Sequence, residues 1–265
     1  MRIAHLSDLH FGKIAHPEIV GILIKEVNAS DVDLVVVSGD LTQRARYGEF
    51  EDAAAMLEAI QPPTLVVPGN HDVYPWWNPF KRMFAPLGRF QRFISDDLLP
   101  SFEQDGVAVL GVNSAHGRTI KGGRIASADR EAMEAFFESC GADVCKVLVV
   151  HHHLTKIRAL GPHDVARKAQ KTLQLASELG VDLILCGHLH ISHIEPLEVV
   201  PEAHRLVVAS AGTATSSRGR RSNREMNFYN VIDVNADGFT IQERRYYTDD
   251  GRFGEERSTH FTTVA

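Results

Sequence analysis

The chain has 265 residues, of which 44% are hydrophobic and 23% are charged, proportions that are ordinary for a globular protein with a sizeable core. Its formal net charge of −6 argues against an extended, non-specific grip on nucleic acid, which usually requires a basic face. No apolar run approaches the ~18 residues of a membrane span, so we expect no membrane contact through such a segment.

The front part of the chain predicts alternating strands and helices. Short β-branched apolar runs indicate buried strands, and the segments between them have helical periodicity. The expected strands are residues 2–6, 34–37, 64–67, 107–112, 146–150 and 183–185, and the expected helices are residues 17–28, 47–60, 127–139 and 165–179, with an interrupted helical stretch at 78–94. This alternation predicts an α/β fold.

After residue 191 the pattern changes to strands alone. We expect them at 194–200, 205–209, 227–234 and 239–247, with a hairpin turn at 235–238. No linker interrupts the chain, which predicts a single domain over 1–265, with a catalytic core of 1–215 and a β-rich C-terminal portion of 191–250. The β-rich end offers an edge that could pair with a second copy of the chain, so a homo-oligomer stays open.

The cysteines predict reduced thiols. Cys140, Cys145 and Cys186 are odd in number and lack a second pair in metal-ligand spacing, which disfavours a zinc ribbon. The first motif begins at Asp8 and leaves no room for a signal peptide before the fold. We therefore expect a cytoplasmic protein, in which thiols stay reduced.

Polar blocks follow five of the expected strands. They are Asp8-Leu9-His10, Gly39-Asp40, Gly69-Asn70-His71-Asp72, His151-His152-His153 and Gly187-His188-Leu189-His190. Functional groups of α/β folds collect beyond the carboxyl ends of the strands, so we expect these blocks to converge. Asp8 and His10 are two residues apart, and on an extended segment such a pair points the same way; His188 and His190 repeat the spacing.

Asp, Asn and His side chains bind divalent metals through oxygen and imidazole nitrogen. The blocks hold too many such ligands for one metal with an open position, and their number suits two. Asp40 is the natural bridging carboxylate for two closely spaced dications, which can make a bridging water a hydroxide near neutral pH. The sequence therefore predicts a two-metal hydrolytic site.

The five blocks, in this order and at comparable spacing, resemble the signature of the calcineurin-like metallophosphoesterases. Thr42 after Asp40, together with the triple histidine, looks most like the bacterial class III cyclic-nucleotide and glycerophosphodiester phosphodiesterase branch. The resemblance covers residues 3 to about 190. It implies a four-layer αββα sandwich, here with a β-rich C-terminal portion.

The resemblance also implies roles for individual residues. It assigns one metal to Asp8, His10, Asp40 and His190, and the other to Asp40, Asn70, His151 and His188. In the triple histidine the matching position is the first residue after the strand, which favours His151. His71 resembles the family's catalytic histidine, which contacts the phosphate or assists the leaving group. Asn70 would help to position the phosphate, and Asp72 would orient His71.

The expected function is a metal-dependent phosphoesterase, and more specifically a phosphodiesterase acting by in-line attack of a hydroxide that bridges two metals. The substrate would be a small phosphate ester, such as a cyclic nucleotide or a glycerophosphodiester. Mixed nitrogen and oxygen ligation suits Mn, Fe, Zn or Co. A phosphomonoesterase, a DNA or RNA nuclease, and a non-catalytic binding scaffold are the alternatives; the acidic net charge disfavours the nuclease.

Several residues near these blocks stay open between a structural and a functional role. His152 and His153 either pack locally or touch substrate. Trp76, Trp77 and Phe80 either line a pocket or anchor a helix start. A basic cluster follows the small-residue stretch 210–217, and it is either a solvated loop or a segment that reaches an anionic substrate or a partner subunit; it consists of Arg218, Arg220, Arg221 and Arg224.

Overall fold

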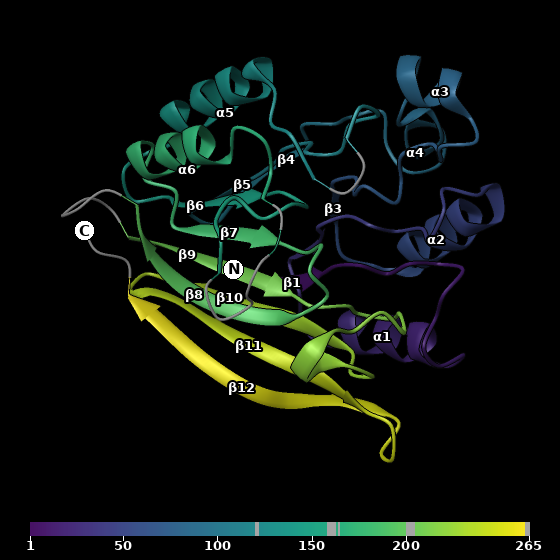
Figure 1. Cartoon of the computed structure of the whole chain (residues 1–265). Coiled ribbons are helices and arrows are strands. Elements are labelled where there is room, and N and C mark those ends of the chain that lie inside the picture. The colour runs from purple at the N-terminus through teal and green to yellow at the C-terminus, as the bar shows by residue number, and fades with distance from the viewer. Residues whose placement is uncertain (120–121, 158–162, 164, 200–204, 263–265) are drawn as a thin grey trace.

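The computed structural model describes residues 1–119, 122–157, 163, 165–199 and 205–262. Figure 1 shows two stacked sheets with helices around them. The first sheet has the strand order β12-β11-β10-β1-β2-β3. Its strands are β1 (Arg2–Leu6), β2 (Leu34–Val37), β3 (Thr64–Val66), β10 (Phe228–Asn235), β11 (Gly238–Tyr247) and β12 (Arg252–Thr262). β1, β2 and β3 are parallel, and the other three strands add to β1 in antiparallel order.

The second sheet has the strand order β4-β5-β6-β7-β9-β8. Its strands are β4 (Ser101–Gln104), β5 (Val107–Gly111), β6 (Cys145–Val149), β7 (Leu183–Cys186), β8 (Ser192–Glu198) and β9 (Arg205–Ala211). The four inner strands are parallel, and β4 and β8 form antiparallel edges. The strands that follow residue 191 thus divide between both sheets. The division into a core and a β-rich portion stays a prediction.

Alternating side chains of single strands build the layers. In β2, Val35 and Val37 pack in the cluster with helix residues such as Leu23, whereas Leu34 and Val36 pack between the sheets. The run is apolar throughout because both faces of the strand are covered.

The helices cover the outer faces of the sheets. α1 (Ile19–Asn28) and α2 (Tyr47–Ala59) pack on the first sheet, and α5 (Ser127–Ser139) and α6 (Ala169–Glu178) on the second. α3 (Pro79–Phe84) and α4 (Gly88–Phe93) correspond to the interrupted stretch, and Figure 1 shows them beyond β3. The expected four-layer αββα sandwich is confirmed.

Two differences from the expected elements have local causes. α6 begins at Ala169 and not at Val165, because Lys168 has a φ of 68° and the Arg167 amide donates to the Gly123 carbonyl at 2.7 Å. β4 and β12 were not predicted, because they are edge strands with many exposed side chains and no continuous apolar run.

One expected strand reaches beyond the described residues, because Val200, the last residue of the expected strand 194–200, lies outside them. None of the described helices is long and apolar enough to cross a membrane.

Candidate metal centre

The five polar blocks lie where parallel strands end. Asp8 follows β1, Asp40 follows β2 and Asn70 follows β3 in the first sheet; His151 follows β6 and His188 follows β7 in the second. Because the sheets are stacked, the loops beyond the carboxyl ends of these strands meet: side chains from both sheets share one cluster. The structure therefore brings all five blocks together, as expected from their positions.

The first ligand cluster contains Asp8, His10, Asp40 and His190, whose donor atoms all lie within 4.8 Å of one another. His190 Nε2 lies 3.0 Å from Asp8 Oδ1 and 3.2 Å from His10 Nε2. His10 Nε2 lies 3.6 Å from Asp40 Oδ2. The four side chains that the family resemblance assigns to one metal thus direct their donor atoms to the same buried position.

The second ligand cluster surrounds His151. Its Nε2 lies 3.3 Å from Asn70 Oδ1 and 3.4 Å from Asp40 Oδ2. The donor atoms of His151, His152 and His188 lie within 4.8 Å of one another. Asp40 Oδ2 therefore faces both clusters, which is the position that a bridging carboxylate needs.

The histidine tautomers follow from the backbone around the clusters. Nδ1 of His10 donates to the Thr42 carbonyl at 3.1 Å, Nδ1 of His151 to Ser38 at 2.7 Å, and Nδ1 of His190 to Arg218 at 2.9 Å. A carbonyl oxygen only accepts, so each ring carries a proton on Nδ1 and turns Nε2 inward. Burial lowers the pKa of His10 to about 4, which keeps that ring neutral.

The centre of the site is rich in electron pairs and poor in donors. In these tautomers the Nε2 lone pairs of His10 and His190 face each other. Asp8 Oδ1, Asp40 Oδ2 and His152 Nε2 are buried and accept no hydrogen bond from any described residue. Unpaired buried carboxylates cost several kcal/mol, so this donor set fits divalent cations.

The pKa of His151 also indicates a site that attracts cations. Burial lowers the pKa of His151 and the charge of Asp40 raises it, to about 9 overall. A proton and a divalent cation therefore compete for His151 Nε2.

The ligand residues adopt a backbone conformation that side chains rarely favour. Asp8, His10, Asp40, His188 and His190 have φ values of 54°, 49°, 54°, 70° and 57°. Left-handed conformations cost about 1–3 kcal/mol each and persist where the surroundings enforce them, typically at functional sites. The spacing argument for Asp8 and His10 therefore had the wrong geometry: the pair converges because both residues turn left-handed, not because the segment is extended.

Two glycines allow the loops to approach this closely. A Cβ at Gly69 would lie 2.1 Å from Asp40 Oδ1, and one at Gly187 would lie 1.8 Å from Ser7 Oγ. Any side chain at either position would displace a ligand loop.

Asp72 does not orient the His71 ring. Its oxygens accept from the amides of Leu41, Thr42 and Gly69, at 3.2, 2.9 and 2.9 Å, and from Thr42 Oγ1 at 2.9 Å. Burial and the charge of Asp40 raise its pKa to about 7. The expected role of Asp72 is corrected: it ties the loop after β2 to the loop after β3.

His71 is held by another group. Its Nδ1 donates to the Gln43 carbonyl at 2.7 Å, and its ring centroid lies 4.8 Å from that of His10. The Arg218 guanidinium donates to its Nε2 at 3.0 Å. His71 thus lies at the rim of the first cluster.

His152 and His153 differ in what their rings contact. His152 contacts Ser114 Oγ through Nδ1 at 2.8 Å and turns Nε2 toward the second cluster. His153 instead contacts Cys186 Sγ at 3.6 Å and packs locally. The sequence left both open, because adjacent histidines in a loop have no periodicity that distinguishes them. It assigned neither Arg218 nor His152 to the site.

A sequence profile described as calcineurin-like phosphoesterase matches residues 1–192. The chain belongs to the calcineurin-like phosphoesterase family. The resemblance drawn from the five blocks is thereby confirmed.

Two relatives are phosphodiesterases by name. The glycerophosphodiester phosphodiesterase GpdQ of Enterobacter lignolyticus is 36% identical over 85 residues, which are 27% of this chain and 30% of that protein. The 3′,5′-cyclic adenosine monophosphate phosphodiesterase CpdA of Haemophilus influenzae is 22% identical over 204 residues, 72% of this chain and 70% of that protein. The match thus spans less than a third of GpdQ.

A solved structure supports the fold. A dimetal phosphatase from Danio rerio superposes with a TM-score of 0.71 at 11% sequence identity, covering 100% of this chain and 99% of that one. At this identity the likeness concerns the fold alone.

Proposed function

We propose that this member of the calcineurin-like phosphoesterase family is a phosphodiesterase that uses two divalent cations. The observation that carries the proposal is the shared position of Asp40 Oδ2, which faces two sets of inward-turned ligands. The names of the relatives support diester substrates, including cyclic nucleotides and glycerophosphodiesters.

The residues that would hold the cations are those predicted from the sequence. One set is Asp8, His10, Asp40 and His190, and the other is Asp40, Asn70, His151 and His188. Bound dications would supply Lewis acidity to the phosphate oxygens and lower the pKa of a shared water. Mixed nitrogen and oxygen donors suit Mn, Fe, Zn or Co.

The chain itself would position the phosphate and manage the proton. The Asn70 side chain lies at the edge of the second cluster and could donate from Nδ2 to a phosphate oxygen. His71 is anchored through Nδ1 to Gln43, so Nε2 is its reactive atom. Nε2 accepts from Arg218 in this structure and would donate to the leaving oxygen only after it takes up a proton and parts from Arg218. Arg218, which contacts that atom, adds a positive charge beside it.

The proposal is tested with bis(p-nitrophenyl) phosphate under each candidate metal. Asp40→Asn keeps the shape of the side chain and exchanges Oδ2 for an amide. Asp40→Asn and Asn70→Ala, each made singly, should each lower kcat/KM on the order of a hundredfold or more. Asp33→Asn, the same exchange at the opposite end of β2, is the matched control and should keep activity. Near-wild-type hydrolysis by a folded Asp40→Asn protein would refute the assignment.

A substrate panel separates the alternatives. A monoester such as p-nitrophenyl phosphate, cyclic AMP and single-stranded DNA should distinguish a phosphomonoesterase, a phosphodiesterase and a nuclease. Absence of bound metal in elemental analysis, with no hydrolysis after metal addition, would favour the binding scaffold.

We also propose a cytoplasmic location. The three cysteines form no disulfide with one another, which suits a reducing compartment. Pairing of copies through an edge strand stays a prediction.

A further inference from the structure

A cavity of about 460 Å³ opens beside Asn70 and His71, and its size is typical of small-molecule sites. Its other walls come from the loops after β1, β2 and β3 and from Arg218. Its lining includes Lys13, Arg44, Trp76, Trp77, Arg82 and Arg218.

The lining is strongly positive, although the chain has a net charge of −6. Four of the lining residues are Lys or Arg, and none is Asp or Glu. Lys13 and Arg44 are exposed, and neither makes an ion pair with a described residue. A concave positive surface of this kind concentrates anions.

Arg218 is more constrained than Lys13 and Arg44. Its Nη1 donates to Gln43 Oε1 at 3.2 Å and to His71 Nε2 at 3.0 Å. It is half-buried and has no carboxylate within ion-pair distance among the described residues. Its carbonyl is fixed by His190 Nδ1, so the guanidinium is directed from the first ligand cluster into the cavity. A half-buried arginine bound only by neutral groups is a site for an anion.

Arg82, the fourth cation, makes structural contacts. The Arg82 guanidinium donates to the carbonyls of Tyr74 and Thr119 and lies over the Trp76 ring at 4.2 Å from its centroid. It therefore holds Trp76 in place and is not free to pair with a ligand.

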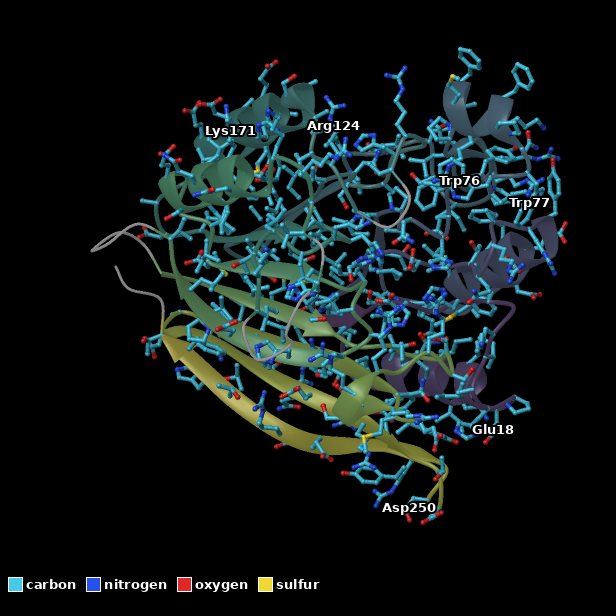
Figure 2. All side chains as sticks on the ribbon, in the orientation of Figure 1. Glu18, Trp76, Trp77, Arg124, Lys171 and Asp250 are labelled. Carbon is cyan, nitrogen blue, oxygen red and sulfur yellow. The ribbon has the colours of Figure 1, made fainter. Side chains whose placement is uncertain are left out.

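The tryptophans form an apolar wall. Trp76 and Trp77 are 54% and 66% exposed, and Figure 2 shows them together at the surface near α3. Indole faces of this exposure can stack on a planar ring such as a nucleotide base.

We propose that this cavity selects phosphodiesters that carry a second phosphate beside a planar base, as a nucleotide with a terminal phosphate does. The inference rests on the proposed phosphodiesterase function. The scissile phosphate would occupy the two ligand clusters. Arg218, with Lys13 and Arg44, would bind the second phosphate, and Trp76 and Trp77 would contact the base. A leaving group without a second charge would leave these cations without a partner.

The test compares two dinucleotides that differ by one phosphate: thymidylyl-thymidine with and without a 5′-phosphate. Wild-type kcat/KM should be at least tenfold higher for the phosphorylated form, the factor expected from one charge-assisted hydrogen bond. Arg218→Ala should bring the ratio close to one, and Arg218→Lys should keep part of it. Arg224→Ala removes one positive charge from the same segment at a side chain that is 81% exposed, and it should keep the full ratio.

A binding measurement keeps the inference separate from the proposed function. Calorimetry of thymidine 3′,5′-bisphosphate with the unreactive Asp40→Asn protein should give an affinity that the added Arg218→Ala change lowers at least tenfold and Arg224→Ala does not. Equal rates for both dinucleotides, in an enzyme that hydrolyses bis(p-nitrophenyl) phosphate, would overturn the inference alone. No hydrolysis of any diester would overturn the proposed function, and the bisphosphate affinities would still decide the cavity: an affinity unchanged by Arg218→Ala would refute it.

Discussion

Removal of the cations should lower the thermal stability of the protein by an amount that the structure allows us to estimate. At a free metal concentration 100 times the Kd, binding to the folded state contributes about 2.7 kcal/mol per site. A chain of 265 residues unfolds with an entropy of about 0.56 kcal/mol per kelvin, from roughly 2.1 cal/mol/K per residue. Chelation with EDTA should therefore lower the Tm by about 5 °C for each filled site.

The Asp40→Asn variant makes this prediction specific to the site. Asp40 Oδ1 accepts from the His71 amide at 2.8 Å, and asparagine can keep this bond while it loses the inward-facing Oδ2. The variant should fold and show little or no EDTA-dependent shift in scanning calorimetry. Asp33→Asn should keep the wild-type shift. The reasoning fails if EDTA leaves the wild-type Tm unchanged, or if Asp40→Asn shifts as much as wild type.

Three other substitutions separate structure from chemistry. Asp72→Ala leaves three buried amides without an acceptor, so it should lower the free energy of unfolding by at least about 3 kcal/mol. His71→Ala should instead lower kcat with little change in the urea midpoint. The reverse pattern would contradict the corrected role of Asp72. Gly187→Ala should displace Asp8 and reduce the bound metal measured by mass spectrometry, and full metal content would count against the close packing at this loop. Tyr229→Phe removes a hydrogen bond of 2.8 Å to Glu26 and should lower the Tm by about 3–6 °C without changing kcat, and a loss of kcat would show unexpected coupling to the site.

The sequence allowed the candidate ligands to be proposed because each follows a recognisable strand. Asp8, Asp40, Asn70 and His151 lie within three residues of the end of an apolar run, and parallel strands bring their carboxyl ends together. The left-handed backbone at His10 and His190 was not predicted, because φ depends on contacts between distant loops and not on the residue itself.

The sequence left the basic cluster open between a solvated loop and a segment that reaches an anionic substrate, and it did not single out Arg218. This residue follows Gly212 and a run of small residues in an irregular segment, and nothing in its neighbours distinguishes it from Arg220 or Arg224. Contacts between distant segments place it at the site: His190 donates to its carbonyl, and its guanidinium contacts Gln43 and His71. Edge strand β12 was not predicted because it has no apolar run. It is held by its backbone hydrogen bonds to β11.

Both sheets supply side chains to each ligand cluster. Asp8, His10, Asp40 and Asn70 belong to loops of the first sheet, and His151, His188 and His190 to loops of the second. The apolar layer between the sheets, including Val36 and Val149, therefore acts as a spacer that sets how far apart these two sets of side chains stand. A change in the volume of that layer would alter the distance between the candidate ligands without touching any of them, so we expect core substitutions to change which cation radius the site accepts.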